Sequence, residues 1–228
     1  MKIILQISAV LLAVTAMPKN SIVNLHVYYE SLCPDSRNFI NSQLVPTWNE
    51  LMDFMNVTMN PFGKATVRSY NGPSFSQRLR NRFANQRVRP FTPNGDSWDF
   101  TCQHGPAECD GNALQSCVLK YTEDPTIRLN YINCLMQNPG EGEACGASVG
   151  QSYVPSIQAC YEGLEGKALL KDYGDETLSL DPALTFVPWL IFDGEWNEQS
   201  QWNGFFALKS EVCNRLTVAP AQCQTKRN

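Results

Sequence analysis

The sequence lacks a long apolar segment beyond its first residues. After residue 16, no run is long and apolar enough to form a transmembrane helix, which argues against a protein that spans a membrane. Before that point, Lys2 is followed by an apolar run over residues 3–14 and by small residues at Val14-Thr15-Ala16. This pattern predicts a secretory signal peptide over residues 1–16. We therefore expect a mature protein that is soluble and either lumenal or extracellular.

Acidic residues are absent between Asp53 and Asp96. Basic residues give this stretch a formal charge of +7, whereas the whole chain carries −4. The stretch is expected to form the most positive surface and is a candidate site for an anionic ligand. The alternative is a solvated segment whose arginines pair with acidic groups elsewhere. No nucleic-acid-binding motif accompanies the charge, so nucleic acid is the least favoured partner. The arginines of this candidate site are Arg78, Arg80, Arg82, Arg87 and Arg89.

The residues around Cys33 follow a strand-turn-helix pattern. Residues 22–29 read as a buried strand, and Pro34 opens a helix that is predicted to run to about residue 55 with a kink at Pro46. A second, interrupted strand is predicted over residues 57–59 and 65–67, parallel to the first. This places Cys33 at a helix N-terminus, where free N–H groups and the helix dipole favour the thiolate. Thioredoxin-like redox proteins place their attacking thiol at such a junction.

The second cysteine of a Cys-x-x-Cys pair is missing, because Ser36 stands in its place. A serine hydroxyl can donate a hydrogen bond to the Cys33 thiolate, but it cannot displace a sulfur atom. We therefore expect Cys33 to attack a disulfide and then to require an external thiol. The alternative is an inert buried cysteine, which the position of Cys33 at the strand-helix junction disfavours.

The sequence contains nine cysteines, an odd number. Exported proteins favour disulfides, and an odd count leaves at least one cysteine unpaired within the chain. Cys33 is the candidate, because it lies far upstream of the others; the alternative is that it forms an intermolecular bridge. Disulfides are expected among the remaining cysteines, in a connectivity that the sequence leaves open: Cys102, Cys109, Cys117, Cys134, Cys145, Cys160, Cys213 and Cys223.

A late strand is predicted over residues 187–192. Pro188 is tolerated at its start, because that position need not donate a hydrogen bond to the sheet. By analogy with thioredoxin-like folds, we expect Pro188 to be a cis-proline opposite Cys33. Asp193-Gly194 predicts a hairpin turn. Helices are predicted over residues 112–121, 126–137, 155–171 and 198–216.

Cysteines and a histidine cluster at residues 102–117, which read Cys-Gln-His-Gly-Pro-Ala-Glu-Cys-Asp-Gly-Asn-Ala-Leu-Gln-Ser-Cys. Their spacing is not that of common structural zinc sites, so no metal and no cofactor are expected. We interpret His104 as a structural hydrogen-bonding residue in a glycine-containing turn. His26 is interpreted as a core or edge residue of the first strand.

The fixed positions of this cluster follow the pattern Cys-Gln-His-Gly-x-x-Glu-Cys-x-x-Asn-x-x-x-x-Cys. The sequence thereby resembles the gamma-interferon-inducible lysosomal thiol reductase (GILT) family, over essentially the whole mature chain. The resemblance implies a thioredoxin-like fold and reduction of protein disulfides in acidic endolysosomal or secreted settings, with Cys33 as nucleophile and Pro188 as the cis-proline. Ser36 and the arginine-rich stretch depart from the family's pattern. The signature residues are Cys102, Gln103, His104, Gly105, Glu108, Cys109, Asn112 and Cys117.

The expected architecture is α/β, a thioredoxin-like fold with a helical, disulfide-rich insertion. After the signal peptide, the thioredoxin-like domain is expected in two parts, over residues 17–69 and 151–216. The arginine-rich segment and the cysteine-rich insertion lie between them at 70–150, and a tail follows at 217–228. Asn56 lies in a glycosylation sequon, Asn56-Val57-Thr58.

Two functions are compatible with these observations. The first is a secreted or endolysosomal thiol oxidoreductase that acts on protein disulfides by attenuated or monothiol exchange. Its catalytic residues would be Cys33, Ser36 and Pro188, and an external thiol would be the reductant. The second is a redox-inactive secreted binding protein on the same scaffold, which acts through its surface, including the basic segment 64–89.

Overall fold

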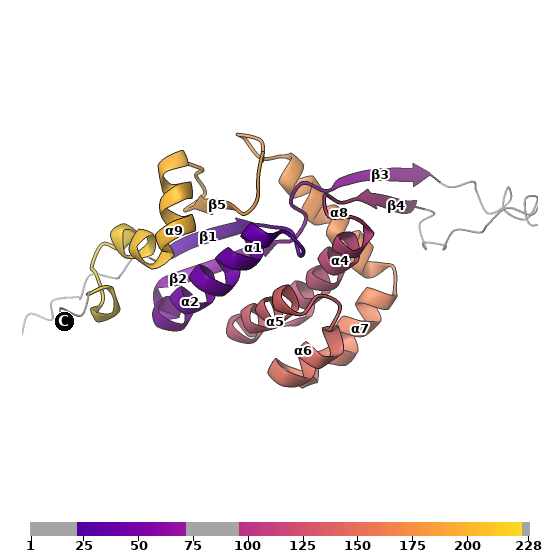
Figure 1. Ribbon diagram of the computed structural model, residues 1–228, viewed down its shortest axis with the longest axis horizontal. Coiled ribbons are helices and arrows are strands. Elements are labelled where there is room, and N and C mark those ends of the chain that lie inside the picture. The colour runs from indigo at the N-terminus through magenta and orange to yellow at the C-terminus, as the bar shows by residue number, and fades with distance from the viewer. Residues whose placement is uncertain (1–21, 72–95, 225–228) are drawn as a thin grey trace, which may run out of the picture.

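The computed structural model describes residues 22–71 and 96–224 (Figure 1). The predicted signal peptide and the five arginines of the candidate anion site lie outside these residues. Among the helices of the described part, none is long and apolar enough to cross a membrane.

The central sheet has three strands in the order β2-β1-β5. Strand β1 (Val23–Tyr28) lies in the middle, pairs in parallel with β2 (Met55–Asn60) and pairs antiparallel with β5 (Trp189–Phe192). Leu25 and Val27 of β1 are fully buried, which fits a central strand. The parallel β1–β2 pair confirms the β-α-β unit predicted from the sequence.

The crossover between β1 and β2 is not one kinked helix to residue 55, as the sequence predicted. It consists of α1 (Pro34–Phe39), a π-helical turn (Ile40–Leu44), α2 (Val45–Leu51) and a 3₁₀ turn (Met52–Phe54). Pro46 has no N–H to donate within a helix, and the wider π turn directly before α2 accommodates it. The Val45 N–H accordingly bonds to the Ile40 carbonyl.

The predicted interrupted second strand is in fact two strands of different sheets. Strand β3 (Thr66–Asn71) leaves the central sheet and pairs antiparallel with β4 (Asp96–Thr101), which the sequence analysis did not predict. The separation occurs at a tight turn. Gly63 adopts a positive φ of 56°, and the Ala65 N–H donates to the Phe62 carbonyl. A side chain at Gly63 would also collide with Glu30, so the turn requires glycine there.

A group of helices follows β4 and lies to one side of the central sheet (Figure 1). The predicted helix 155–171 is instead two helices, because the chain is extended at Gly163, where φ is −82° and ψ is −161°. Helix α7 packs against α4 and α6, and α8 packs against α4 and the β3–β4 pair. The helices of this group are α4 (Pro106–Tyr121), α5 (Pro125–Gln137), α6 (Gly142–Val149), α7 (Val154–Glu162) and α8 (Glu165–Leu178), with a 3₁₀ turn (Gln151–Tyr153) before α7.

Four disulfides staple the described chain, as expected for the eight downstream cysteines. The bond between Cys117 and Cys160 joins α4 to α7, and both sulfurs lie in the main apolar core. The other pairs close short loops and are Cys102–Cys109, Cys134–Cys145 and Cys213–Cys223. All nine cysteines lie within the described residues, and Cys33 is the one that remains outside a disulfide.

The chain returns to the sheet at β5 and then forms a helix on the side of the sheet away from the α4–α8 group (Figure 1). The predicted hairpin turn is present: Asp193 and Gly194 adopt φ of 55° and 85°, and Phe192 forms a bridge with Glu195. Helix α9 (Glu198–Arg215) packs against β5 and the π-helical turn, and its backbone departs from helical geometry at Ala207. A 3₁₀ turn (Ala221–Cys223) follows.

Candidate active site

Cys33 lies at the junction between β1 and α1. It is the N-cap residue of α1, with extended backbone angles of −66° and 123°, and Pro34 occupies the first helical position. The Arg37 N–H donates to the Cys33 carbonyl at 3.0 Å, which closes the first helical turn. The Cys33 side chain is 7% exposed, so the thiol lies just beneath the surface.

The Val187-Pro188 peptide bond is cis and faces Cys33. The Sγ atom of Cys33 lies 3.9 Å from the Val187 carbonyl oxygen, although 154 residues separate the two along the chain. Gln201 of α9 fixes the backbone after this bond. Its Oε1 accepts from the Leu190 N–H at 2.7 Å, and its Nε2 donates to the Pro188 carbonyl at 3.0 Å. The sequence analysis missed Gln201, since nothing local marks a glutamine that is fully buried.

Ser36 is fully buried one helical turn after Cys33. Its Oγ accepts a long hydrogen bond of 3.4 Å from the Glu30 N–H. Within the part of the chain that the structure describes, no hydrogen bond joins Ser36 Oγ to Cys33 Sγ. In this geometry the serine therefore holds the loop before Cys33.

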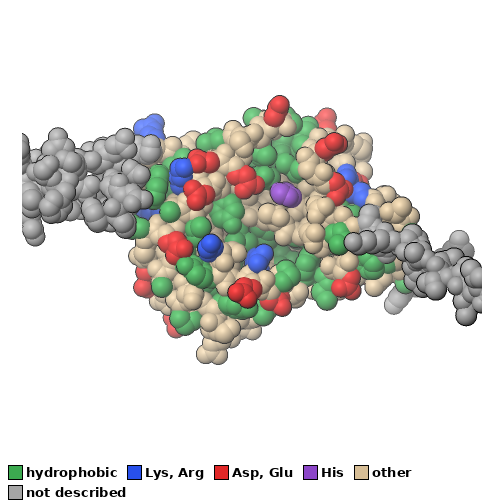
Figure 2. Space-filling model, turned by 180° about the vertical axis from the view of Figure 1, so that it is seen from behind, with side chains coloured by type: hydrophobic (Ala, Val, Ile, Leu, Met, Phe, Trp, Pro, Cys, Tyr) green, Lys and Arg blue, Asp and Glu red, His purple; other side chains and the backbone are tan. Residues whose placement is uncertain are grey.

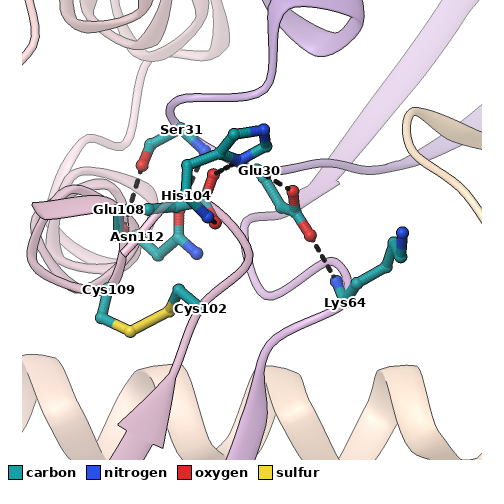
Figure 3. Close-up of a disulfide and its surroundings, with 8 residues drawn as sticks. All are labelled: Glu30, Ser31, Lys64, Cys102, His104, Glu108, Cys109 and Asn112. Carbon is teal, nitrogen blue, oxygen red and sulfur yellow. Dashed lines mark hydrogen bonds and ion pairs between the residues drawn. A yellow bond between two sulfur atoms is a disulfide. The ribbon is translucent and has the colours of Figure 1, made fainter. Parts of the chain in front are cut away.

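The signature segment braces the same loop from another part of the chain (Figure 3). The Ser31 N–H donates to Asn112 Oδ1 at 2.9 Å, and Ser31 Oγ donates to the Glu108 carbonyl at 3.1 Å. Helix α4 approaches so closely that a Cβ atom at Gly111 would lie 2.6 Å from Ser31 Oγ. The signature thus positions the residues that lead into Cys33, a role that its pattern alone does not reveal.

His104 and two glutamates form a compact cluster behind this loop (Figure 3). The His104 N–H donates to Glu108 Oε1 at 3.0 Å, and His104 Nδ1 lies 2.5 Å from Glu108 Oε2 and 3.6 Å from Glu30 Oε2. Both carboxylates are fully buried. Burial raises the pKa of the Glu30 carboxyl above its ordinary value. These three residues are the ones in the described chain whose donor atoms lie close enough together to hold a metal ion.

The remaining predicted site residues lie outside this arrangement. Gln103 is exposed, and Gly105 supplies the positive φ of 88° at the start of α4. Cys102 and Cys109 are bonded to each other beside the cluster. Asn56 is exposed on β2, where its Nδ2 donates to Asn24 Oδ1. His26 is half-buried on the central strand and is therefore not at an edge.

Aromatic side chains gather next to the cis-proline. Phe186 stacks on Trp202 with ring centroids 5.3 Å apart, and Trp189 stacks on Trp196 at 4.5 Å. Trp202 is 41% exposed and Phe206 is 69% exposed. An apolar surface therefore begins one residue before Val187. The sequence analysis did not identify it, because its members come from β5, from α9 and from the segments that flank β5.

A cavity of about 460 Å³ opens on the loop between Glu30 and Cys33. Ser31 and Leu32 form part of its wall, and residues of α4, α5, α6 and α7 and of the loop between α5 and α6 supply the rest. Figure 2 shows one face of the molecule, on which the acidic and basic side chains of the described residues are interspersed with apolar ones. Because the cavity adjoins the loop that leads into Cys33, and the aromatic surface adjoins Val187, both are candidates for contact with a disulfide-bearing substrate.

Known proteins with similar sequences cover most of this chain. A gamma-interferon-inducible lysosomal thiol reductase-like protein of Anopheles gambiae is 30% identical over 216 residues, covering 88% of this chain and 80% of that protein. The gamma-interferon-inducible lysosomal thiol reductase of Carassius auratus is 31% identical over 207 residues, covering 88% and 72%. GILT-like protein 1 of Drosophila melanogaster is 28% identical over 224 residues, covering 90% and 80%.

A family model and a solved structure complete the comparison. The solved structure, provisionally assigned as a protein disulfide isomerase from Nitrosomonas europaea, aligns with a TM-score of 0.47 at 11% identity, over 78% of this chain and 87% of that one. The model of the family described as gamma interferon inducible lysosomal thiol reductase (GILT) matches residues 24–79 and 80–149, more than half of the chain. The chain therefore belongs to the gamma-interferon-inducible lysosomal thiol reductase family.

Proposed function

We propose that this protein is a thiol-disulfide oxidoreductase that reduces protein disulfides by a monothiol mechanism. The observation that carries the proposal is the free Cys33 at a helix N-terminus, 3.9 Å from the carbonyl oxygen that precedes a cis-proline. The names of the relatives support thiol reduction as the activity. Their lysosomal designation and the four disulfides support a secreted or lysosomal location.

The proposed reaction begins with attack of the Cys33 thiolate on one sulfur of a substrate disulfide. A Cys33–substrate disulfide forms, the substrate S–S bond breaks, and the second substrate sulfur leaves as a thiolate. Ser36 cannot attack this mixed disulfide. An external thiolate attacks the Cys33 sulfur, releases the remaining substrate thiol and is itself left bonded to Cys33. A second external thiol restores Cys33 and leaves as the oxidised external disulfide.

The test compares three variants in cleavage of a fluorescent disulfide substrate. Cys33→Ser should fall to background with excess small thiol at mildly acidic pH. Without external thiol, the wild type should accumulate one Cys33–substrate disulfide per chain, visible by non-reducing mass analysis. Ser36→Cys should release substrate without external thiol, because the introduced thiol can then form an intramolecular disulfide with Cys33. Ser42→Cys is the matched control, since Ser42 is exposed in the π-helical turn that directly follows α1.

The outcomes separate this function from the alternative. Equal background activity of wild type and Cys33→Ser would refute the oxidoreductase. The absence of a resolving thiol and the +7 stretch would then favour a binding protein that acts through segment 64–89. In that case, charge reversal at Arg80, Arg82 and Arg87 should weaken retention on heparin in a salt-dependent manner. Retention that is insensitive to salt and to these changes would refute the binding function.

A further inference from the structure

The cluster of Glu30, His104 and Glu108 takes no part in the thiol chemistry described above. Glu30 follows β1, whereas His104 and Glu108 come from the signature segment (Figure 3). One donor atom from each residue lies within 4.8 Å of the other two. We propose that these three side chains form a binding site for one divalent transition-metal cation. The proposal is independent of whether Cys33 turns over.

When both carboxyl groups are ionised, the side chains of this cluster carry more negative than positive charge. Two fully buried carboxylates face a single imidazole, which carries at most one positive charge. Glu30 Oε2 points at His104 Nδ1 from 3.6 Å, and it has no hydrogen-bond partner among the described residues. Buried carboxylate oxygens are normally paired or coordinate a metal ion. An unpartnered, fully buried oxygen directed into the cluster therefore points to a cation.

Each glutamate is held so that one oxygen remains for a ligand. Glu30 Oε1 accepts the Lys64 N–H at 2.7 Å, and Glu108 Oε1 accepts the His104 N–H at 3.0 Å. Both Oε2 atoms consequently face His104 Nδ1. Backbone donors that fix one oxygen of a ligating carboxylate are the outer-shell contacts expected around a metal. The arrangement thus supplies a three-donor set that is already oriented.

The separations fit a cation after one local adjustment. Donors that bind zinc at about 2.0–2.2 Å in tetrahedral geometry lie roughly 3.3–3.6 Å apart. The 3.6 Å between His104 Nδ1 and Glu30 Oε2 agrees with this range. The 2.5 Å between His104 Nδ1 and Glu108 Oε2 is a hydrogen bond, which the cation would replace. About 1 Å of side-chain movement is enough.

The surroundings indicate the class of metal. One imidazole nitrogen and two carboxylate oxygens suit Zn²⁺ or Mn²⁺, and no thiolate competes at the cluster because Cys102 and Cys109 are bonded to each other. About a third of the His104 side chain is exposed, whereas the side chains of Glu30 and Glu108 are fully buried. The cation would enter from the histidine side and keep water there.

A bound cation would also fasten the active-site loop. Glu30 contributes its carbonyl to the Cys33 N–H at 3.3 Å and its N–H to Ser36 Oγ at 3.4 Å. Coordination would join the end of β1 to the start of α4 directly behind these contacts. Binding to the folded state alone raises the free energy of unfolding, so the metal should stabilise the protein.

The experiment measures metal binding to the mature, chelator-treated protein. Mn²⁺ is titrated and followed by electron paramagnetic resonance, and Zn²⁺ by calorimetry. Wild type and Cys33→Ser should each bind one ion. Glu30→Gln and Glu108→Gln should each weaken binding by at least about tenfold. The matched control is Glu165→Gln, which changes an exposed carboxylate that bonds to Tyr121, and it should bind as the wild type does.

A second measurement protects the test against variants that fail to fold. The melting temperature of the wild type should rise with Zn²⁺ and return with EDTA. Absence of binding by the folded wild type would overturn the proposal. Loss of binding in Cys33→Ser would also overturn it, because the thiol would then be the ligand. Undiminished binding in folded Glu30→Gln and Glu108→Gln would overturn it equally.

Discussion

Replacing Gln201 tests how the segment after the cis-proline is held. Gln201 is fully buried and bonds to two backbone groups, the Leu190 N–H and the Pro188 carbonyl. Leucine has a similar size and no polar atoms, so Gln201→Leu leaves both groups buried and unpaired. Each unpaired group costs about 1–3 kcal/mol, and the variant should therefore lose about 2–6 kcal/mol of unfolding free energy. That is a large part of the total stability of an ordinary domain.

The assay for Gln201→Leu is equilibrium denaturation under non-reducing conditions, with Gln199→Leu as the matched control. Gln199 lies on the same helix, is exposed and bonds only to Asn203 among the described residues, so its replacement should change stability by less than about 0.5 kcal/mol. Gln201→Leu should also speed alkylation of Cys33, because Val187 lies against the thiol. Equal stability of the two variants would refute the assigned role of Gln201.

Three further perturbations address the disulfides, the loop and the buried acid. Joint replacement of Cys117 and Cys160 by alanine opens a loop of sequence separation 43 and should cost about 4 kcal/mol, measured by urea unfolding. Gly111→Ala pushes a methyl group to 2.6 Å from Ser31 Oγ, so it should lower the melting temperature and slow disulfide cleavage more than an alanine at an exposed glycine does. In metal-free protein, burial raises the pKa of Glu30 above 4.5, so the folded state holds a proton that the unfolded chain has released. Stability should therefore fall as pH rises from about 4.5 through the raised pKa, and Glu30→Gln should flatten that dependence in calorimetric melts.

Local sequence patterns predicted the part of the fold that depends on neighbouring residues. The strand before Cys33, the helix that begins at Pro34 and the turn at Asp193-Gly194 all follow from residues within a few positions. Hydrophobic periodicity and turn chemistry act over such distances, so a single sequence contains them. The split at Gly163 escaped because apolar residues continue with helical spacing on both sides of it.

The candidate site was predicted only in part, because most of its contacts join distant segments. Ser31 bonds to Asn112, which lies 81 residues further along the chain. Gln201 lies on α9 and bonds to the backbone of β5, the strand that precedes this helix. Glu30 is separated from His104 by a helical crossover and the three strands β2, β3 and β4, so nothing in its neighbourhood marks it as part of a cluster. The pattern at residues 102–117 identified important positions without revealing which segment they contact.

The four disulfides differ in how far solvent reaches their sulfur atoms. Cys117 and Cys160 are 0% and 2% exposed, whereas Cys213 and Cys223 lie only partly within the core. Under the proposed monothiol mechanism, the external thiols that regenerate Cys33 also attack the protein's own disulfides. We therefore expect added thiol to reduce the partly buried Cys213–Cys223 disulfide first and the fully buried Cys117–Cys160 disulfide last.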